Sequence, residues 1–188
     1  MTPRRAERVT PARGGPASSL VDARIDALPN LRIDVLAEDA PSVVTGIGGW
    51  LCDQSMAGWT VRLLTSPAGD ETALRVLGVT TADAETVVDD RYWADPPSMC
   101  IVSTPLYVAR STVRDGLHRV LTRGNSEVVL WGATCPPGLT PGPGLETGPS
   151  RLAGIFWQHA AAGIVADPPS VPATMFNVRP SSPPRGRF

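Results

Sequence analysis

The sequence contains no lysine, so all 17 of its basic residues are arginine. This absence excludes phosphate-binding loops of the Walker type, which require a lysine. Histidine occurs twice and cysteine three times, and the cysteines form no CxxC pair. His118 and His159 have no companion at metal-ligand spacing, so we expect neither a metal nor a cofactor. The odd number of cysteines also argues against a closed disulfide framework.

Long apolar runs are also missing. None approaches the ~20 residues that a helix needs to cross a bilayer. The N-terminal stretch carries arginines but no apolar segment, unlike a secretory signal, and we therefore expect a cytoplasmic protein. The net charge of −1 combines an acidic middle with basic ends. Because an acidic body repels phosphate backbones, the charge pattern disfavours nucleic acid as a partner.

Glycine and proline are abundant, with 18 and 20 residues, and they are concentrated at the two ends and in the segment 135–150. Such segments are typical of chain that lacks a packed core. This distribution predicts five regions along the chain: a disordered Arg/Pro-rich arm (1–18), an α/β domain (19–133), a Pro/Gly linker (134–150), a C-terminal helix that docks back on the sheet (151–166) and a disordered Pro-rich tail (167–188).

A pattern of strand, proline, helix and strand occurs twice, at Val35–Leu64 and at Cys100–Trp131. Only an α/β arrangement buries both the apolar stripe of each helix and the faces of its strands. We therefore predict a single α/β domain built on two βαβ-like units. Its sheet is expected to be mixed but mostly parallel, with about five strands and with helices packed on its faces.

Individual segments refine this prediction. Met99–Val102 and Val128–Trp131 are continuous apolar runs, which favours central parallel strands joined by one helix over Leu106–Arg123. Trp59–Thr65 and Ala73–Val79 alternate in polarity, and the turn residues between them indicate an antiparallel hairpin. In the glycine run that begins at Gly46, the missing side chains indicate close packing of a helix on the sheet.

Ligands of open parallel sheets bind beyond the carboxyl ends of the strands, where the strand order reverses. In this chain that edge would collect polar and small residues from three strands. They are Glu38 and Asp39 after the first strand, Ser103 and Thr104 after the fourth, and Gly132, Thr134 and Cys135 after the fifth. We take this set as the candidate ligand-binding site and assign no catalytic residue.

Each part of the set also has a purely structural explanation. Glu38 and Asp39 precede a helix and would complement its dipole. Thr104 before a proline has the pattern of a helix N-cap. Cys135 would need a nearby histidine or positive charge to act as a nucleophile, and the sequence does not place one beside it.

The pair Glu38-Asp39, followed by Ala-Pro and a helix, resembles the opening of two-component receiver domains. The resemblance covers about 30 residues and extends to Gly58 and Trp59 at the entry to the second strand. It would imply that the acidic pair binds Mg²⁺. The chain departs from the family because Ala73–Val79 leads to no phosphoacceptor aspartate and because no lysine is present.

No complete catalytic signature is present, and basic Pro-rich ends flank an acidic body. The leading hypothesis is therefore a non-enzymatic regulatory or protein-interaction domain with a protein partner, and self-association is compatible with it. The alternative is a small-molecule-binding protein or enzyme with a pocket at the carboxyl ends of the central strands.

Overall fold

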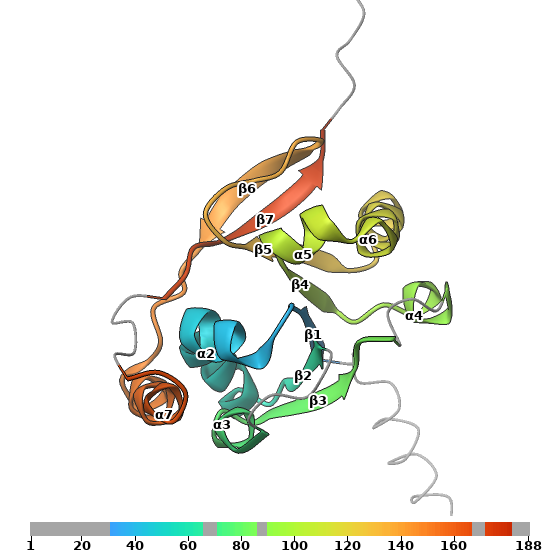
Figure 1. Ribbon diagram of the computed structural model, residues 1–188. Coiled ribbons are helices and arrows are strands. Elements are labelled where there is room, and N and C mark those ends of the chain that lie inside the picture. The colour runs from blue at the N-terminus through green and yellow to red at the C-terminus, as the bar shows by residue number, and fades with distance from the viewer. Residues whose placement is uncertain (1–30, 66–70, 86–89, 167–171, 182–188) are drawn as a thin grey trace, which may run out of the picture.

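The computed structural model describes residues 31–65, 71–85, 90–166 and 172–181. Within them, one sheet has the strand order β3-β2-β1-β4-β5-β7-β6 (Figure 1). The strands are β1 (Arg32–Leu36), β2 (Thr60–Thr65), β3 (Val79–Asp83), β4 (Met99–Ser103), β5 (Glu127–Trp131), β6 (Leu139–Leu145) and β7 (Met175–Pro180). The helices are α2 (Ala40–Met56), α3 (Glu71–Val76), α4 (Asp90–Ala94), α5 (Thr104–Ala109), α6 (Ser111–Arg123) and α7 (Arg151–Ala162).

The five strands from β3 to β5 are parallel, and β7 and β6 extend the sheet in the antiparallel sense. A single α/β domain with a mixed sheet and packed helices is confirmed. The predicted strand count of about five is wrong, because the sheet has seven strands. β4 and β5 are parallel neighbours, with Cys100 opposite Val128. The strand order reverses between β1 and β4, which lie side by side.

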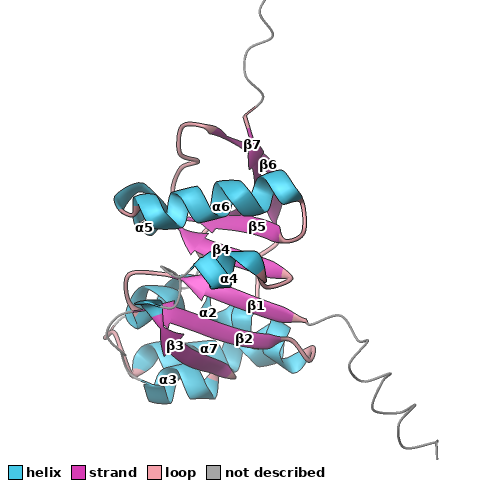
Figure 2. Cartoon of the chain, turned by 90° about the vertical axis from the view of Figure 1, so that its right-hand side faces the viewer, coloured by secondary structure: helices cyan, strands magenta, loops and turns pink. Residues whose placement is uncertain are grey.

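The helices divide between the two faces of the sheet (Figure 2). α2, α3 and α7 cover one face, which we call the sealed face. α4, α5 and α6 cover the other, which we call the open face. On the sealed face, Ile33 and Val35 of β1 pack against α2. On the open face, Leu36 of β1 packs in the cluster that contains Leu117 and Val120 of α6.

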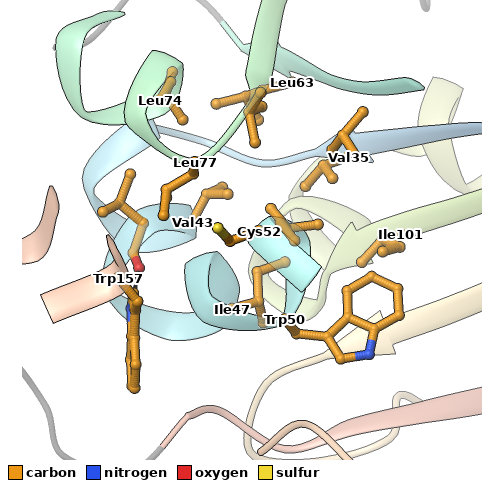
Figure 3. Packing of buried hydrophobic residues seen from close by; sticks show 14 of the residues in the cluster. Val35, Val43, Ile47, Trp50, Cys52, Leu63, Leu74, Leu77, Ile101 and Trp157 are labelled. Atoms are coloured by element: carbon orange, nitrogen blue, oxygen red, sulfur yellow. Dashed lines mark hydrogen bonds between the residues drawn. The ribbon is translucent and has the colours of Figure 1, made fainter. Parts of the chain in front are cut away.

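On the sealed face, large apolar side chains from α2, α3 and the sheet point toward one another (Figure 3). α7 lies over α2, and the Trp157 indole nitrogen donates a hydrogen bond of 2.6 Å to the Val44 carbonyl. A β-carbon at Gly48 would lie 2.9 Å from Leu77 and 3.1 Å from Trp157. At Gly48 the run therefore packs on the residue that follows α3 and on α7 rather than on the sheet, whereas Gly46 does approach Trp131 of β5.

The hairpin predicted for Trp59–Thr65 and Ala73–Val79 is wrong. Residues 71–76 form helix α3, and β3 then runs parallel to β2. Ala73, Leu74 and Leu77 are buried at a spacing that suits one helical face. Gly78, at φ +72°, ends the helix and turns the chain into β3, in the left-handed region that glycine adopts without strain.

The linker predicted at 134–150 contains β6, and the tail predicted at 167–188 contains β7. β7 becomes a strand because Met175, Phe176 and Val178 are buried between its two neighbours. β6 tolerates its prolines and glycines because it is an edge strand with an irregular register between Pro141 and Gly144.

The helix predicted at 151–166 corresponds to α7, which packs on α2 and α3 rather than mainly on the sheet. The predicted arm (1–18), the first residues of the predicted domain (19–30) and parts of the predicted tail lie outside the described residues. In the part of the chain that the structure describes, no helix combines the length and the apolar character needed to cross a membrane.

Candidate functional site

Glu38 lies at the carboxyl end of β1, beside the point where the strand order reverses. The hydroxyl of Ser103, at the end of β4, donates to the Glu38 carboxylate at 3.3 Å. The hydroxyl of Thr65, at the end of β2, donates to the Glu38 backbone carbonyl at 3.0 Å. Ser103 and Thr65 are only 1% and 5% exposed. Buried hydroxyls from both neighbouring strands thus hold Glu38, one at its exposed carboxylate and the other at its backbone carbonyl.

Ser103 has a second role as the N-cap of α5, since its hydroxyl oxygen accepts the Leu106 N–H at 3.2 Å. Pro105 follows in the first helical turn, where a missing N–H costs nothing. The cap was predicted at Thr104 and lies one residue earlier. One hydroxyl therefore both starts α5 and orients Glu38.

A cavity of about 280 Å³ opens beside Glu38 on the open face. One wall comes from the ends of β1 and β2 and the residue after β3, and the other comes from α5, α6 and their junction. Most of the lining is apolar, with two charged residues and one threonine. The lining residues are Leu36, Ala37, Glu38, Leu64, Ala84, Leu106, Ala109, Arg110, Thr112 and Val113.

Arg110 reaches the cavity because the helix predicted over Leu106–Arg123 is two helices. Its backbone is extended (φ −113°, ψ 106°) between α5 and α6. The Arg114 guanidinium donates to the carbonyls of Tyr107 at 3.4 Å and Val108 at 3.2 Å. These carbonyls belong to the last turn of α5, which has no further helical partners. Arg114 therefore stabilises the break that places Arg110.

A second group of predicted residues lies at the end of β5, and none of its members lines the cavity. The Thr104 hydroxyl donates to the Trp131 carbonyl at 3.2 Å and to the Thr134 carbonyl at 3.5 Å. Gly132 has φ +143°, and a β-carbon there would lie 2.8 Å from the Thr104 hydroxyl oxygen. These residues hold the start of α5 against the chain that leaves β5.

Cys135 is half-buried, and burial raises the pKa of its thiol. Its sulfur contacts the carbonyls of Pro136 and Leu139 at 3.8 and 3.7 Å. The ring of His118 contacts the Tyr107 hydroxyl at 3.2 Å instead. A raised pKa and the lack of a described basic partner both disfavour a catalytic thiolate at this position.

Asp39 caps α2, because its carboxylate accepts the Ser42 N–H at 2.7 Å. Within the ranges that the structure describes, no group of three His, Cys, Asp or Glu side chains could hold a metal ion. The two residues expected to act as an acidic pair therefore differ. Asp39 caps the N-terminus of α2, whereas Glu38 lines the cavity.

Of the predicted site residues, Glu38 alone lines the cavity. Ser103 does not line it but donates a hydrogen bond to the Glu38 carboxylate. Sequence reasoning missed Arg110, Thr112 and the apolar lining. A signal was present at Ser111-Thr112, since a Ser-Thr pair inside a helical pattern competes with the helix for backbone hydrogen bonds.

No family model matches this chain, and no curated protein matches its sequence. Solved structures do share the fold. A40926 pseudoaglycone deacetylase Dbv21 is 14% identical, with a TM-score of 0.57 over 82% of this chain and 99% of its own. A teicoplanin deacetylase in complex with teicoplanin is 12% identical, with a TM-score of 0.56 over 80% of this chain and 99% of its own. The zinc-inhibited form of teicoplanin deacetylase Orf2 gives the same values.

At these identities the likeness shows the fold. It also corrects the leading hypothesis of a non-enzymatic regulatory or protein-interaction domain, because these chains, matched over almost their whole length, are enzymes. The comparisons favour the alternative hypothesis. One of these structures is a zinc-inhibited form. In the described part of this chain, no three His, Cys, Asp or Glu side chains lie close enough together to hold such an ion.

Proposed function

We propose that this protein binds a small amphipathic molecule in the cavity at the carboxyl edge and that its fold is an enzyme scaffold rather than a regulatory one. The observation that carries the proposal is the cavity of about 280 Å³ beside Glu38. The Glu38 carboxylate accepts from the buried Ser103 hydroxyl, and its backbone carbonyl accepts from the buried Thr65 hydroxyl. The cavity lies at the reversal of strand order, where open α/β sheets bind their ligands.

The lining determines the kind of molecule that fits. Leu36, Leu64, Leu106 and Val113 provide a surface that favours hydrocarbon. Glu38, Arg110 and Thr112 provide a few polar groups that would orient the ligand. An apolar pocket with a small number of converging polar groups is the usual form of a small-molecule site.

The first test is a thermal-shift and calorimetric screen with octanoate, octylamine, leucine, phenylalanine and N-acetylated amines. The variant Ala109→Trp places a large side chain on the cavity wall. Val108→Trp is the matched control, because Val108 precedes it on the same helix, is 61% exposed and does not line the cavity. We expect a probe that stabilises the wild type and the control but not Ala109→Trp. Equal stabilisation of all three proteins, or of none, would overturn the proposal.

A second candidate function is hydrolysis of an N-acyl amide, which is favoured because the structures compared above are deacetylases. In this chain Glu38 would accept a proton from water as the water oxygen forms a bond to the acyl carbon. The C–N bond then breaks, and Glu38 returns the proton to the leaving amine. No step runs through a metal, because the described residues do not provide a ligand set.

The test of hydrolysis measures the carboxylate released from N-acetyl and N-octanoyl amines. Glu38→Gln should lower the turnover number at least a hundredfold while leaving the half-saturating concentration within a fewfold, because a general base contributes about 10²–10⁴ in rate. Glu127→Gln, at the opposite end of the sheet, serves as the control. Turnover that survives Glu38→Gln would rule this candidate out.

A further inference from the structure

Two opposite charges line the cavity without neutralising each other. Glu38, on the strand wall, accepts a hydrogen bond from Ser103 and forms no ion pair within the described residues. Arg110, at the junction of α5 and α6, has neither an ion pair nor a side-chain hydrogen bond among the described residues. Within the part of the chain that the structure describes, neither charge has an oppositely charged partner, so both can meet a ligand.

Different parts of the fold position the two charged residues along the chain. Glu38 is fixed by Thr65 and Ser103, which belong to the strands on either side of β1. The position of Arg110 follows from the helix break that Arg114 stabilises. Because Ser103 orients the Glu38 carboxylate before binding, that group loses little conformational freedom when a ligand binds, which raises affinity.

Charge then discriminates between ligand classes. A simple anion would meet the carboxylate of Glu38, and a simple cation would meet the guanidinium of Arg110. A ligand that carries both an ammonium and a carboxylate offers a partner of opposite charge to each of the two groups. The guanidinium can bind a carboxylate through two parallel hydrogen bonds, and the Glu38 carboxylate can accept from an ammonium.

We propose that the ligand is a zwitterion with an apolar arm, and specifically an α-amino acid with a branched aliphatic or aromatic side chain. Its ammonium would contact Glu38, its carboxylate would contact Arg110, and its side chain would fill the space between Leu36, Leu64 and Val113. This inference rests on the proposed function, since it assigns the chemistry of the molecule that occupies the same cavity.

The test is isothermal titration calorimetry with L-leucine and L-phenylalanine. Phenethylamine, which lacks the carboxylate, and 3-phenylpropanoate, which lacks the ammonium, are the matched probes. A hydrogen bond to a charged group contributes about 1.5–3 kcal/mol, so each truncated probe should bind about tenfold or more weakly than L-phenylalanine. Phenylalanine and leucine should bind in the same order of magnitude.

Two variants test which residue binds the ammonium and which binds the carboxylate of the ligand. Glu38→Gln should weaken L-phenylalanine about tenfold or more and leave 3-phenylpropanoate unchanged or improved. Arg110→Gln should weaken L-phenylalanine by a similar factor and leave phenethylamine unchanged or improved. Arg75→Gln, on α3 at the sealed face, is the control and should change none of the affinities.

The outcomes separate this inference from the function on which it rests. If either truncated probe binds as tightly as the amino acid, or if octanoate or octylamine binds through the cavity and no amino acid does, the zwitterion assignment is wrong and the cavity remains a binding site. If no probe distinguishes the wild type from Ala109→Trp, the proposed function fails together with the inference.

Discussion

The sealed face and the open face of the sheet are built on different principles. The sealed face buries a continuous apolar cluster under α2, α3 and α7, with glycines of α2 letting Trp131, Leu77 and Trp157 approach closely. The open face buries a smaller apolar cluster, and it also contains Asp34, whose carboxylate has no exposure to solvent. The cavity lies on this second face.

This difference indicates that the sealed face contributes mainly to stability and the open face mainly to binding. The sealed face buries the larger apolar cluster and should therefore supply most of the stability. The open face combines charge, a gap between elements and a broken helix, which are features that binding sites require and that cost stability. Substitutions on the two faces should therefore differ in what they change.

The largest loss should come from the sealed face. Trp157→Ala should lower the free energy of unfolding by about 3–5 kcal/mol, because the indole is 3% exposed, covers Gly48 and donates to the Val44 carbonyl. Urea denaturation measures this loss. Ile155→Ala on the same helix is the control, since Ile155 is 60% exposed. Similar losses for the two variants would contradict the account of the sealed face.

A smaller loss is expected at Asp34 on the open face. Its carboxylate accepts from Arg62 at 2.8 and 2.7 Å and lies 3.5 Å from Arg32. Asp34→Leu should cost about 3 kcal/mol, because it leaves partly buried guanidinium groups without their partner. In urea denaturation the double variant with Arg62→Leu should lose less than the single one. A larger loss in the double variant would show that the pair itself supplies net stability.

Alkaline pH should also weaken the open face. Burial raises the pKa of the Cys100 thiol from 9.0 to about 12, and the negative charge of Asp34 adds to this shift. The folded protein therefore keeps a proton that the unfolded chain releases, so stability is complete below pH 9 and falls as the pH rises from 9 toward 12. Between pH 7 and pH 10 the loss from this thiol is on the order of 1 kcal/mol.

Urea midpoints at pH 7 and pH 10 measure that loss, and Cys100→Ala should reduce the pH-dependent part. Tyr92, whose pKa is also raised by burial, would retain a share of it. An unchanged pH dependence in Cys100→Ala would remove Cys100 from the explanation.

The smallest of these effects concerns the hydroxyl that joins the fold to the site. Ser103→Ala removes the N-cap of α5 and should cost about 1 kcal/mol. It should also weaken binding in the cavity, because the Glu38 carboxylate loses its donor. Thr104→Ala is the neighbouring control for binding, measured by the same calorimetry. If it weakens the ligand as much as Ser103→Ala does, Glu38 is not oriented through Ser103.

The parallel centre of the fold could be predicted because its signals are local. Apolar runs at β4 and β5, each followed by a polar residue or a turn, indicate buried strands whatever their partners. Such local patterns also placed Glu38 and Ser103 at one edge of the sheet. Their contact at 3.3 Å follows from strand order, which the βαβ rules constrain.

The remaining features depend on contacts between distant segments. The prolines and glycines of β6 are typical of a loop, and only the partner β7 makes them a strand. The break at Arg110 depends on Arg114 bonding back to α5. The cavity needs residues from β1, β2, α5 and α6 at once, and no local pattern of the sequence contains that combination.

The position of β7 has a consequence for synthesis of the protein. β7 comes last along the described chain, yet it is inserted between β5 and β6 rather than added outside them. During translation, residues 139–145 have no neighbour in the sheet until residues 175–180 leave the ribosome. A nascent chain stopped before residue 175 would thus expose the free edge of β5 to other chains, an arrangement that promotes aggregation.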